Sequence, residues 1–460
     1  MPARFRIEDP TLAEALRKIE QLVRRAGGRT WLVGGSIRDL LLGQQPRDLD
    51  LEVTGVPPGQ VHALLAEYFS VQFVGKAFAV FKLQGLPVDL SIPSRMRTDD
   101  TSLPGLLRQA DPNMPIDEAL ARRDFTINAM AWDPDTMELR DPFNGRGDLD
   151  ARILRHTSNR FAEDPLRVLR GMQLTARFEL TVAPETVALC QTLSQEDHPS
   201  ERLWEEWKKL LLQGRKPSLG LQFLRHSGWL RFYPELAALE GCPQDPIWHP
   251  EGDVWIHTLH CLDWFAAERT GGEPDDLAVG LGVLCHDFGK PATTKEEFGH
   301  VTSRGHESEG AGPTQRFLER LTNQHSLIDE VVPLVCCHLR PRALHDANAS
   351  DSAVRRLARH VKRIDRLVRV ARADHAGRPP KQFDGFPAGE WLLAKARQLE
   401  VDRQTPSPII MGRHLLELGI QPGPDMGRLL DDCYEAQLDG EFGTLEDGLI
   451  YAKSRHSALC

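Results

Sequence analysis

Three acidic residues in the N-terminal part of the chain could hold divalent metal ions. Asp48 and Asp50 are separated by one residue in the segment DLDLEV, so on a β-strand their side chains would point to the same face. Asp89 stands in PVDLSI among apolar neighbours, where an unpaired acid is costly unless it completes the same cation site. Each acid alone could be a turn residue or face solvent. Together, three converging carboxylates can hold two Mg²⁺ ions that activate an attacking hydroxyl and stabilise a departing pyrophosphate.

A glycine pair precedes these acids. Gly34 and Gly35 follow a strand-like segment and open a helix-like one. Bare backbone at this turn would let a triphosphate approach the helix N-terminus, with Arg38 one turn further on as a counter-charge. The pair fits neither the GxGxxG nor the GxxxxGK[ST] pattern, and taken alone it is more simply a tight strand-to-helix turn. The acids that follow favour the phosphate-binding interpretation.

A second charged group could read a nucleobase. Glu163, Asp164 and Arg167 fall within one turn, and Arg170 follows three residues later on the face of Asp164 and Arg167. Arginine can donate to O2 and N3 of cytosine while a carboxylate accepts from its amino group, and adenine also offers an amino donor. The alternative is structural, because Asp164 before Pro165 is also a good helix N-cap.

Histidines and aspartates in the second half of the chain have the order of a metal site. They stand on separate predicted helices, in the order His257, His286-Asp287 and Asp374, and His306 and His338 could join them. Imidazole and carboxylate ligands suit Mn²⁺, Fe, Co²⁺, Ni²⁺ or Zn²⁺, and such a metal lowers the pKa of bound water for attack on a phosphate ester. An isolated histidine is usually structural, but an ordered set predicts a divalent transition-metal site.

The elements that must position these residues predict an α+β protein. An amphipathic helix within residues 1–30, followed by strands and short helices as far as AMAWD, forms a small head with a mixed sheet. From about Asp141 onward the apolar spacing is almost entirely helical. We predict four domains, over residues 1–140, 141–245, 246–380 and 381–460, with proline- and glycine-rich joints near 245, 380 and 407.

Composition narrows the class of protein. No apolar run approaches the roughly 20 residues that span a bilayer, the N-terminal segment has no apolar signal core, and the eight cysteines lie far apart, so we expect a cytoplasmic protein with free thiols. The formal net charge of −10 has the wrong sign for a protein that coats nucleic acid, so any RNA site must be local. One candidate is the arginine-rich stretch 355–372, which could equally be a solvated helix face.

Longer motifs carry a family resemblance. The segments LVGGSIRDLLLGQQPRDLDLEVTG, ARRDFTINAMAWD, DPFNGRGDLDARILRH and FAEDPLRVLR resemble the class II tRNA nucleotidyltransferases, the bacterial CCA-adding enzymes of the polymerase β superfamily. This resemblance covers about residues 28–215. LCHDFGKP, HTLHCL and RGHESEGA resemble the HD phosphohydrolase domain over about residues 250–380.

The resemblance implies an organisation and a set of roles. Residues 1–140 would be a catalytic polymerase-β-like head, 141–245 a helical neck and body that binds the base and tRNA, 246–380 the HD domain and 381–460 a helical tail. It assigns triphosphate binding to Gly34, Gly35 and Arg38, and Mg²⁺ binding to Asp48, Asp50 and Asp89. The nucleotide-binding residues that it adds are Arg122, Arg123, Asp124, Asn128, Glu163, Asp164, Arg167 and Arg170. His257, His286, Asp287 and Asp374 would hold the HD metal, and Glu201-Arg202 would support the helix that reads the base.

The implied reaction is template-independent addition and repair of the 3′-terminal CCA of tRNA from CTP and ATP, with release of pyrophosphate, alongside HD phosphohydrolase activity. One alternative is an A-adding, CC-adding or poly(A) polymerase variant, because the segment 91–117, with Arg95 and Arg97, is unusual where the family has a flexible loop. A second alternative is a nucleotide or cyclic-phosphate hydrolase with an RNA-binding relic head. The sequence leaves the HD substrate, the oligomeric state and the role of the tail open.

Overall fold

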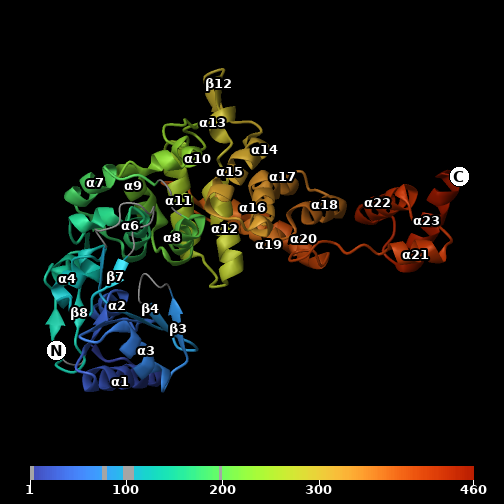
Figure 1. Ribbon diagram of the computed structural model, residues 1–460. Helices are drawn as coiled ribbons and strands as arrows, with labels where there is room; N and C mark the ends of the chain where they lie inside the picture. Colours follow the sequence, from blue (N-terminus) through green and yellow to red (C-terminus); the bar gives the residue numbers. More distant parts are fainter. Residues whose placement is uncertain (1–4, 75–79, 97–107, 196–198, 460) are drawn as a thin grey trace, which may run out of the picture. The chain divides into compact units, whose positions relative to one another are not determined.

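The computed structural model describes residues 5–74, 80–96, 108–195 and 199–459 (Figure 1). The chain forms two compact units: residues up to 196 with 226–229, and residues 197–225 with 230–460. Within the described ranges, no helix is both long and apolar enough to cross a membrane.

The first unit is built on a seven-stranded mixed sheet with the order β3-β4-β5-β2-β1-β8-β9. β2 and β5 run parallel, and the other neighbouring pairs are antiparallel. The strands are β1 (Arg29–Val33), β2 (Leu49–Thr54), β3 (Val71–Val74), β4 (Val80–Leu83), β5 (Val88–Ser91), β8 (Ala131–Trp132) and β9 (Leu139–Arg140). The predicted head with a mixed sheet is confirmed.

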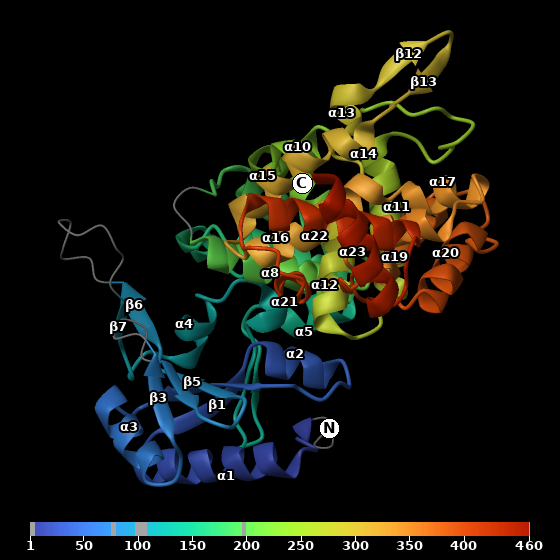
Figure 2. The same cartoon turned by 90° about the vertical axis from the view of Figure 1, so that its right-hand side faces the viewer.

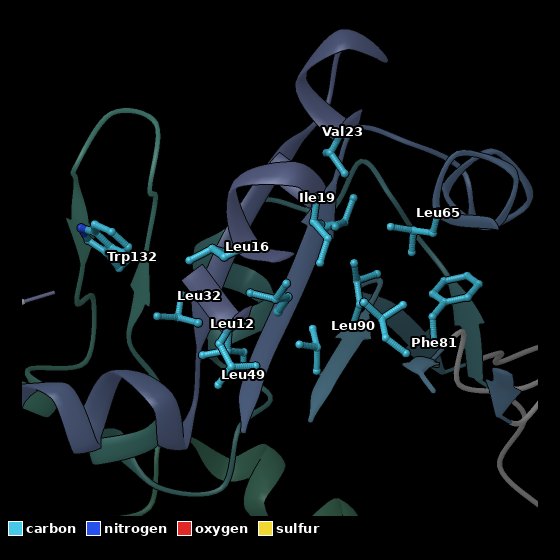
Figure 3. Packing of buried hydrophobic residues seen from close by; sticks show 14 of the residues in the cluster. Leu12, Leu16, Ile19, Val23, Leu32, Leu49, Leu65, Phe81, Leu90 and Trp132 are labelled. Atoms are coloured by element: carbon cyan, nitrogen blue, oxygen red, sulfur yellow. The ribbon is translucent and has the colours of Figure 1, made fainter. Parts of the chain in front are cut away.

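Helix α1 (Pro10–Arg25) packs against this sheet. The Asp9 side chain caps it by accepting hydrogen bonds from two backbone N–H groups of the first turn. Its apolar residues recur at helical spacing and therefore form one buried stripe. The labelled residues of this core in Figure 3 are Leu12, Leu16, Ile19, Val23, Leu32, Leu49, Leu65, Phe81, Leu90 and Trp132.

The parallel pairing of β2 with β5 decides where the acidic residues meet. In this register Asp50 is opposite Asp89, while the flanking pairs Leu49–Val88 and Leu51–Leu90 are buried in the core. A slip of one residue would turn the acids into the apolar layer, so the core pattern holds them on the other face of the sheet.

Helices complete the first unit. They are α2 (Gly35–Leu41), α3 (Pro58–Ala66), α4 (Ile116–Leu120), α5 (Gly145–Asp150), α6 (Arg167–Phe178) and α7 (Pro184–Gln191), with the 3₁₀ turns η2 (Thr126–Asn128) and η3 (Asn159–Glu163). Two short strand pairs lie beside them: β6 (Ser94–Met96) with β7 (Arg108–Ala110), and β10 (Ile153–Leu154) with β11 (Thr181–Val182).

The second unit is almost entirely helical, as predicted. Its helices are α8 (Ser200–Gln213), α10 (Pro234–Ala237), α11 (Val254–Ala267), α12 (Glu273–Cys285), α13 (Lys290–Thr293), α14 (His306–Glu309), α15 (Ala311–Leu321), α16 (His325–Cys337), α17 (Arg340–Asp346), α18 (Asp351–Val361), α19 (Ile364–Ala376), α20 (Pro387–Gln398), α21 (Gly412–Glu417), α22 (Pro424–Asp439) and α23 (Leu445–Leu459), while α9 (Pro217–His226) ends at the boundary between the units.

The sequence did not reveal the exposed hairpin of β12 (Lys295–Glu297) and β13 (His300–Thr302), drawn near α13 and α14 in Figure 2. The hairpin has no apolar alternation, which is the signal that predicts a strand.

Helix α12 is the centre of the second unit and packs against α8, α11, α16 and α19. Two glycines allow this close packing. A Cβ atom on Gly280 would lie 2.8 Å from the Phe265 ring of α11, and one on Gly282 would lie 2.9 Å from Val370 of α19. Because α12 is apolar on every side from Leu277 to Cys285, it carries His286 and Asp287, which follow its last residue, into the interior.

The C-terminal helices α21, α22 and α23 have a hydrophobic cluster of their own. Its buried members are Ile410, Leu415, Ile420, Met426, Leu429, Cys433, Ala436, Phe442 and Ala452. Arg356 and Arg359 of α18 form ion pairs with Glu435 of α22, and Arg356 also pairs with Asp439.

Candidate functional site

The three acids of the first unit converge at the N-terminal ends of the neighbouring strands β2 and β5. Asp48 directly precedes β2 and is exposed, whereas Asp50 and Asp89 are partly buried opposite each other. Burial raises the pKa of the Asp50 carboxyl, Arg123 opposes this increase, and the charges of Asp48 and Asp89 add to it. Like charges held this close are stabilised by a cation, so the donor set fits a divalent metal site. Lys82 Nζ lies 2.9 Å from Asp89 Oδ2 and supplies one positive charge.

The glycine turn brings backbone against this site. Gly34 has φ +67°, and a Cβ atom there would lie 2.8 Å from Arg123 Nη1 and 3.0 Å from Asp50 Oδ2. A side chain at this position would therefore clash with the acid and the arginine, apart from the strain of the positive φ. The predicted strand-to-helix turn is present.

Ser36 is a site residue that the sequence analysis missed. Its buried hydroxyl donates to the Asp48 carbonyl oxygen at 3.1 Å and accepts from the Asp50 N–H at 2.9 Å. The side chain therefore ties the start of α2 to the backbone of both acids. A small hydroxyl residue next to a glycine pair was the only available signal.

Glu52 was also missed, although the alternation that aligns Asp48 with Asp50 extends to it. Arg123 Nη2 donates to Glu52 Oε2 at 3.0 Å, and this buried carboxylate thereby places Arg123 beside Gly34. A cavity of about 190 Å³ is lined by Glu52, Ser91, Arg122 and Arg123 among others.

Residues of three predicted nucleotide-binding motifs form one hydrogen-bonded network around Asp124. Asn128 donates to Asp124 Oδ1 at 3.1 Å and accepts from Arg38 Nη1 at 2.8 Å, while Arg170 Nε donates to Asp124 Oδ2 at 2.7 Å. Burial opposes the charge on Asp124, but Arg170, Asn128 and the Phe125 N–H hold the pKa of this carboxyl at about 2. Arg38 is itself buried and pairs with its neighbour Asp39.

The four residues expected to read a base are near one another in sequence but have different surroundings. Arg167, the first residue of α6, donates to the carbonyl oxygens of Arg160 and Arg122. Asp164 precedes α6 and accepts from the Leu166 N–H at 3.2 Å, but the N-cap residue of α6 is Leu166, so Asp164 is not the helix N-cap. Glu163 pairs with Arg160. Asp164 lies outside the helix because a residue before proline is pushed out of the helical conformation.

Arg95 contacts Asp111 and Glu118, whereas Arg97 and residues 98–107 of the unusual segment lie outside the described residues.

The histidines and aspartates of the second unit converge from five parts of the chain. His257 Nε2 lies 3.1 Å from Asp374 Oδ1, and His286 Nε2 lies 3.2 Å from Asp287 Oδ2. His306 Nε2 lies 3.4 Å from Asp287 Oδ1 and 3.3 Å from His338 Nε2, so the two further histidines also join the cluster. All six side chains are buried.

The histidine rings have the orientation that metal ligation requires. The Nδ1 atoms of His286, His306 and His338 are 2.7–2.8 Å from the carbonyl oxygens of Val283, Ser303 and Val335, so each Nε2 faces the cluster as a lone-pair donor. Burial and the nearby His286 lower the pKa of His338 to about 3, which keeps this ring neutral. His286 Nε2 and the two Asp287 oxygens are buried, and their contacts among the described residues are ion pairs with one another, His257, His306 and Lys290. A divalent metal fits this donor set.

Residues absent from the predicted set surround this cluster. The buried Glu251 carboxylate lies 2.7 Å from His257 Nδ1 and 2.8 Å from His249 Nδ1. Lys290 Nζ is 2.8 Å from Asp287 Oδ2, and Arg378 Nη2 donates to Asp374 Oδ1 at 2.6 Å. Lys290 and Arg378 follow their partners by three and four residues, a helical spacing that could have indicated them.

Several arginines of the stretch 355–372 form ion pairs with acidic residues. Besides the pairs of Arg356 and Arg359 with α22, Arg363 and Arg366 pair with Asp275, and Arg369 pairs with Asp276. These contacts give the arginines a structural role, which neither of the two earlier interpretations included.

Comparisons with known proteins agree with this architecture. Residues 30–155 match the family described as poly A polymerase head domain, residues 179–239 match the probable RNA and SrmB-binding site of polymerase A, and residues 254–370 match the HD domain. The chain thus joins a nucleotidyltransferase head to an HD domain.

Curated relatives identify the family more closely. The chain is 37% identical over 397 residues to the multifunctional CCA protein of Laribacter hongkongensis, covering 82% of this chain and 94% of the relative. It is 34% identical to that of Xanthomonas oryzae, covering 87% and 96%. The chain belongs to the family of multifunctional CCA proteins, the bacterial CCA-adding enzymes with an HD domain.

Solved structures show the same fold. The Bacillus stearothermophilus CCA-adding enzyme in complex with CTP aligns with a TM-score of 0.63 at 22% identity, covering 98% of each chain. The Thermotoga maritima CCA-adding enzyme complexed with tRNA aligns with a TM-score of 0.57 at 19% identity, covering 98% of this chain and 97% of that one. The predicted fold class and family are confirmed.

We expect Ser36→Ala to loosen the acidic site. The change leaves the buried Asp50 N–H without its acceptor, which costs about 1–3 kcal/mol of local stability. Hydrogen–deuterium exchange of the peptide containing Asp50 should therefore accelerate, and nucleotide incorporation should fall. Thr30→Val on β1 is the matched control, because the Thr30 hydroxyl is buried but has no hydrogen-bond partner among the described residues. Equal exchange in the two variants would show that Ser36 does not hold the acids.

Proposed function

We propose that this chain adds and repairs the 3′-terminal CCA of tRNA, using CTP and ATP and releasing pyrophosphate. The observation that carries the proposal is the alignment of Asp50 with Asp89 across β2 and β5, with Asp48 beside them and the Gly34 backbone against Asp50. Relatives named multifunctional CCA proteins, and CCA-adding enzymes solved with CTP, ATP or tRNA, support it. The reaction belongs in the cytoplasm, where tRNA matures in bacteria.

Each residue has a proposed part in transfer. Asp48, Asp50 and Asp89 would hold Mg²⁺, a hard cation that takes carboxylate oxygens. Bound there, Mg²⁺ supplies charge for activating the tRNA 3′-hydroxyl and stabilising the pyrophosphate. Gly34 and Gly35 leave room for the triphosphate, and Arg123 has a guanidinium next to that space. The Asp124 network would position Arg38, Asn128 and Arg170 beside the nucleotide.

Asp164 and Arg167 would choose the base, with Glu163 beside them, whereas Arg122 would bind ribose or phosphate oxygens. An arginine and a carboxylate together can form hydrogen bonds with the edges of cytosine and adenine, because the carboxylate accepts from the amino group of either base. Uracil and guanine carry carbonyls in place of these amino groups and are therefore rejected. The relatives' names favour full CCA addition over an A-only, CC-only or poly(A) activity. The intact acidic site disfavours a relic head, because RNA binding alone requires no cluster of carboxylates.

We propose that the second unit is a metal-dependent phosphohydrolase. His257, His286, Asp287 and Asp374 would hold a divalent transition metal, with His306 and His338 as further ligands, since imidazole donors favour such ions over Mg²⁺. The bound metal supplies a water of lowered pKa. Such a water would serve to hydrolyse a 2′,3′-cyclic phosphate, a reaction that replaces the bond from phosphorus to O2′ by one to the water oxygen and leaves a proton on O2′.

Asp50→Ala should reduce incorporation of CTP and ATP by at least about 100-fold, because it removes a metal ligand from the site. Binding of tRNA should change little, since the acid holds metal and not RNA. Incorporation is measured on tRNA that lacks CCA, and binding by gel shift. The control is Asp150→Ala, which removes an exposed acid of the same unit. Near wild-type turnover in Asp50→Ala would refute the metal assignment.

Asp164→Ala and Arg167→Ala should relax the choice of nucleotide by about 1–3 kcal/mol each, the scale of one bidentate base contact. The measurement supplies tRNAs ending before CCA, after C and after CC with each nucleotide, and sequences the products. Arg177→Ala on the same helix serves as the control. If the variants are only less stable, with the proportions of C and A unchanged, both residues are structural, through the contact of Asp164 with the Leu166 N–H and of Arg167 with two carbonyl oxygens.

His286→Ala combined with Asp287→Ala should abolish hydrolysis of a 2′,3′-cyclic nucleotide and metal binding, measured by elemental analysis with Mn²⁺, Co²⁺ or Ni²⁺. CCA addition should persist, because every proposed transferase residue belongs to the first unit and every HD ligand to the second. A folded double variant that still hydrolyses would make the histidines structural, and one that loses CCA addition would contradict two independent sites.

A further inference from the structure

A cavity of about 250 Å³ opens from the HD metal cluster. Its charged lining includes Asp287, His306, His338 and Asp374, together with Lys290 and Arg378. The same cavity is lined by three apolar side chains, Trp248, Val301 and Leu339. The cavity is therefore amphipathic, with metal-binding groups and an apolar, aromatic part.

Trp248 is the unusual member of this lining. Its side chain is 54% exposed, although tryptophan is among the residues that gain most from burial. The next residue, His249, contacts Glu251, and Glu251 in turn lies 2.7 Å from His257 Nδ1. Trp248 is therefore the sequence neighbour of a residue that contacts Glu251, which in turn contacts the proposed metal ligand His257.

The backbone that carries the indole is fixed. Lys381 Nζ donates to the carbonyl oxygens of Ile247 and Trp248, at 2.7 and 3.0 Å. The Lys381 ammonium and the Arg342 guanidinium lie 5.7 and 5.9 Å from the centre of the indole ring. An exposed aromatic ring with positive charge beside it suits an anionic ligand that has a flat ring.

The size and polarity of the cavity limit this ligand. Ligand cavities commonly measure roughly 300–1000 Å³, so 250 Å³ suits a single small group with one part at the open rim. The metal cluster, Lys290 and Arg378 would take a phosphate, and Trp248 would take an aromatic ring attached to it. A nucleotide combines both parts.

We propose that Trp248 is the stacking platform for the base of the HD substrate, so that this site selects nucleotides over phosphate esters without a base. The inference rests on the proposed hydrolase function. The nucleotide is either free or the last residue of an RNA chain, because both present the same base and phosphate. In either case Trp248 acts in binding, and the phosphate chemistry stays with the metal cluster.

The test compares two substrates that differ only by the base, adenosine 5′-monophosphate and ribose 5-phosphate, with the full-length protein and Mn²⁺, Co²⁺ or Ni²⁺. Trp248→Ala should raise KM for the adenosine nucleotide by at least about fivefold with little change in kcat, and Trp248→Phe should restore it. KM for ribose 5-phosphate should not change. Phe298→Ala is the matched control, since Phe298 is a fully exposed aromatic of the same unit and is not among the residues lining this cavity.

The source of the nucleotide is tested with adenosine 2′,3′-cyclic phosphate and an oligoribonucleotide ending in the same group. Dependence on Trp248 in the first arm indicates a free nucleotide, dependence in the second arm indicates an RNA end, and both results support the platform. An unchanged KM for all nucleotides in Trp248→Ala overturns it.

A binding measurement separates this inference from the hydrolase proposal. The chain has nine tryptophans, so the ¹⁹F resonance of 5-fluorotryptophan at position 248 is assigned as the one missing in Trp248→Phe. Adenosine 5′-monophosphate should shift this resonance and ribose 5-phosphate should not. If the wild-type protein hydrolyses nothing but the shift occurs, the hydrolase proposal fails and the platform stands. If hydrolysis occurs without any shift, the platform fails alone.

Discussion

A carboxylate that is moved out of water needs positive charge beside it, and this constraint shapes both sites. Asp50 is held against Asp48 and Asp89, with Arg123 as the nearby cation. In the second unit, Asp287 is buried beside Lys290 and the histidines, and Asp374 beside Arg378. The desolvation cost of an isolated buried acid would exceed the stability of most folds, so these clusters persist only with their cations in place.

The constraint also explains why some residues near the acids position other side chains without contacting a ligand themselves. Asp124 is fully charged because Arg170, Asn128 and a backbone N–H surround it, and the same contacts fix Arg170 and Asn128 for a nucleotide. Ser36 and Glu52 act similarly on the acids and on Arg123. Removing one such residue should therefore disturb several others, because the members share hydrogen bonds.

In the arginine-rich stretch 355–372 the roles are reversed, because acidic residues compensate the charges of arginines. A protein with net charge −10 can still have a local basic surface, but here Asp275, Asp276 and Glu435 pair with these arginines. The paired cations tie α18 and α19 to neighbouring helices. Arg366 and Asp276 are buried, so their ion pairs compensate charges that have left water and also specify how the helices meet.

Local patterns in the sequence were sufficient to predict much of the architecture. The alternation in DLDLEV predicts a strand with Asp48 and Asp50 on one face, and the helical spacing after Asp141 predicts the helical second half. Long motifs identified the family, because several ordered segments together are specific where a glycine pair is not. Each of these signals lies within a few turns of chain, which is the range over which periodicity and turn chemistry act.

Only the tertiary structure decided which distant residues meet. Asp89 faces Asp50 because β5 pairs in parallel with β2, and Glu251 reaches His257 because a proline- and glycine-rich loop folds back onto α11. The loop composition indicated a joint between domains and contained no periodicity that could reveal a carboxylate or the exposed Trp248. Sequence patterns report the conformation of a segment, whereas the partners of a buried charge are set by the packing of the whole core around it.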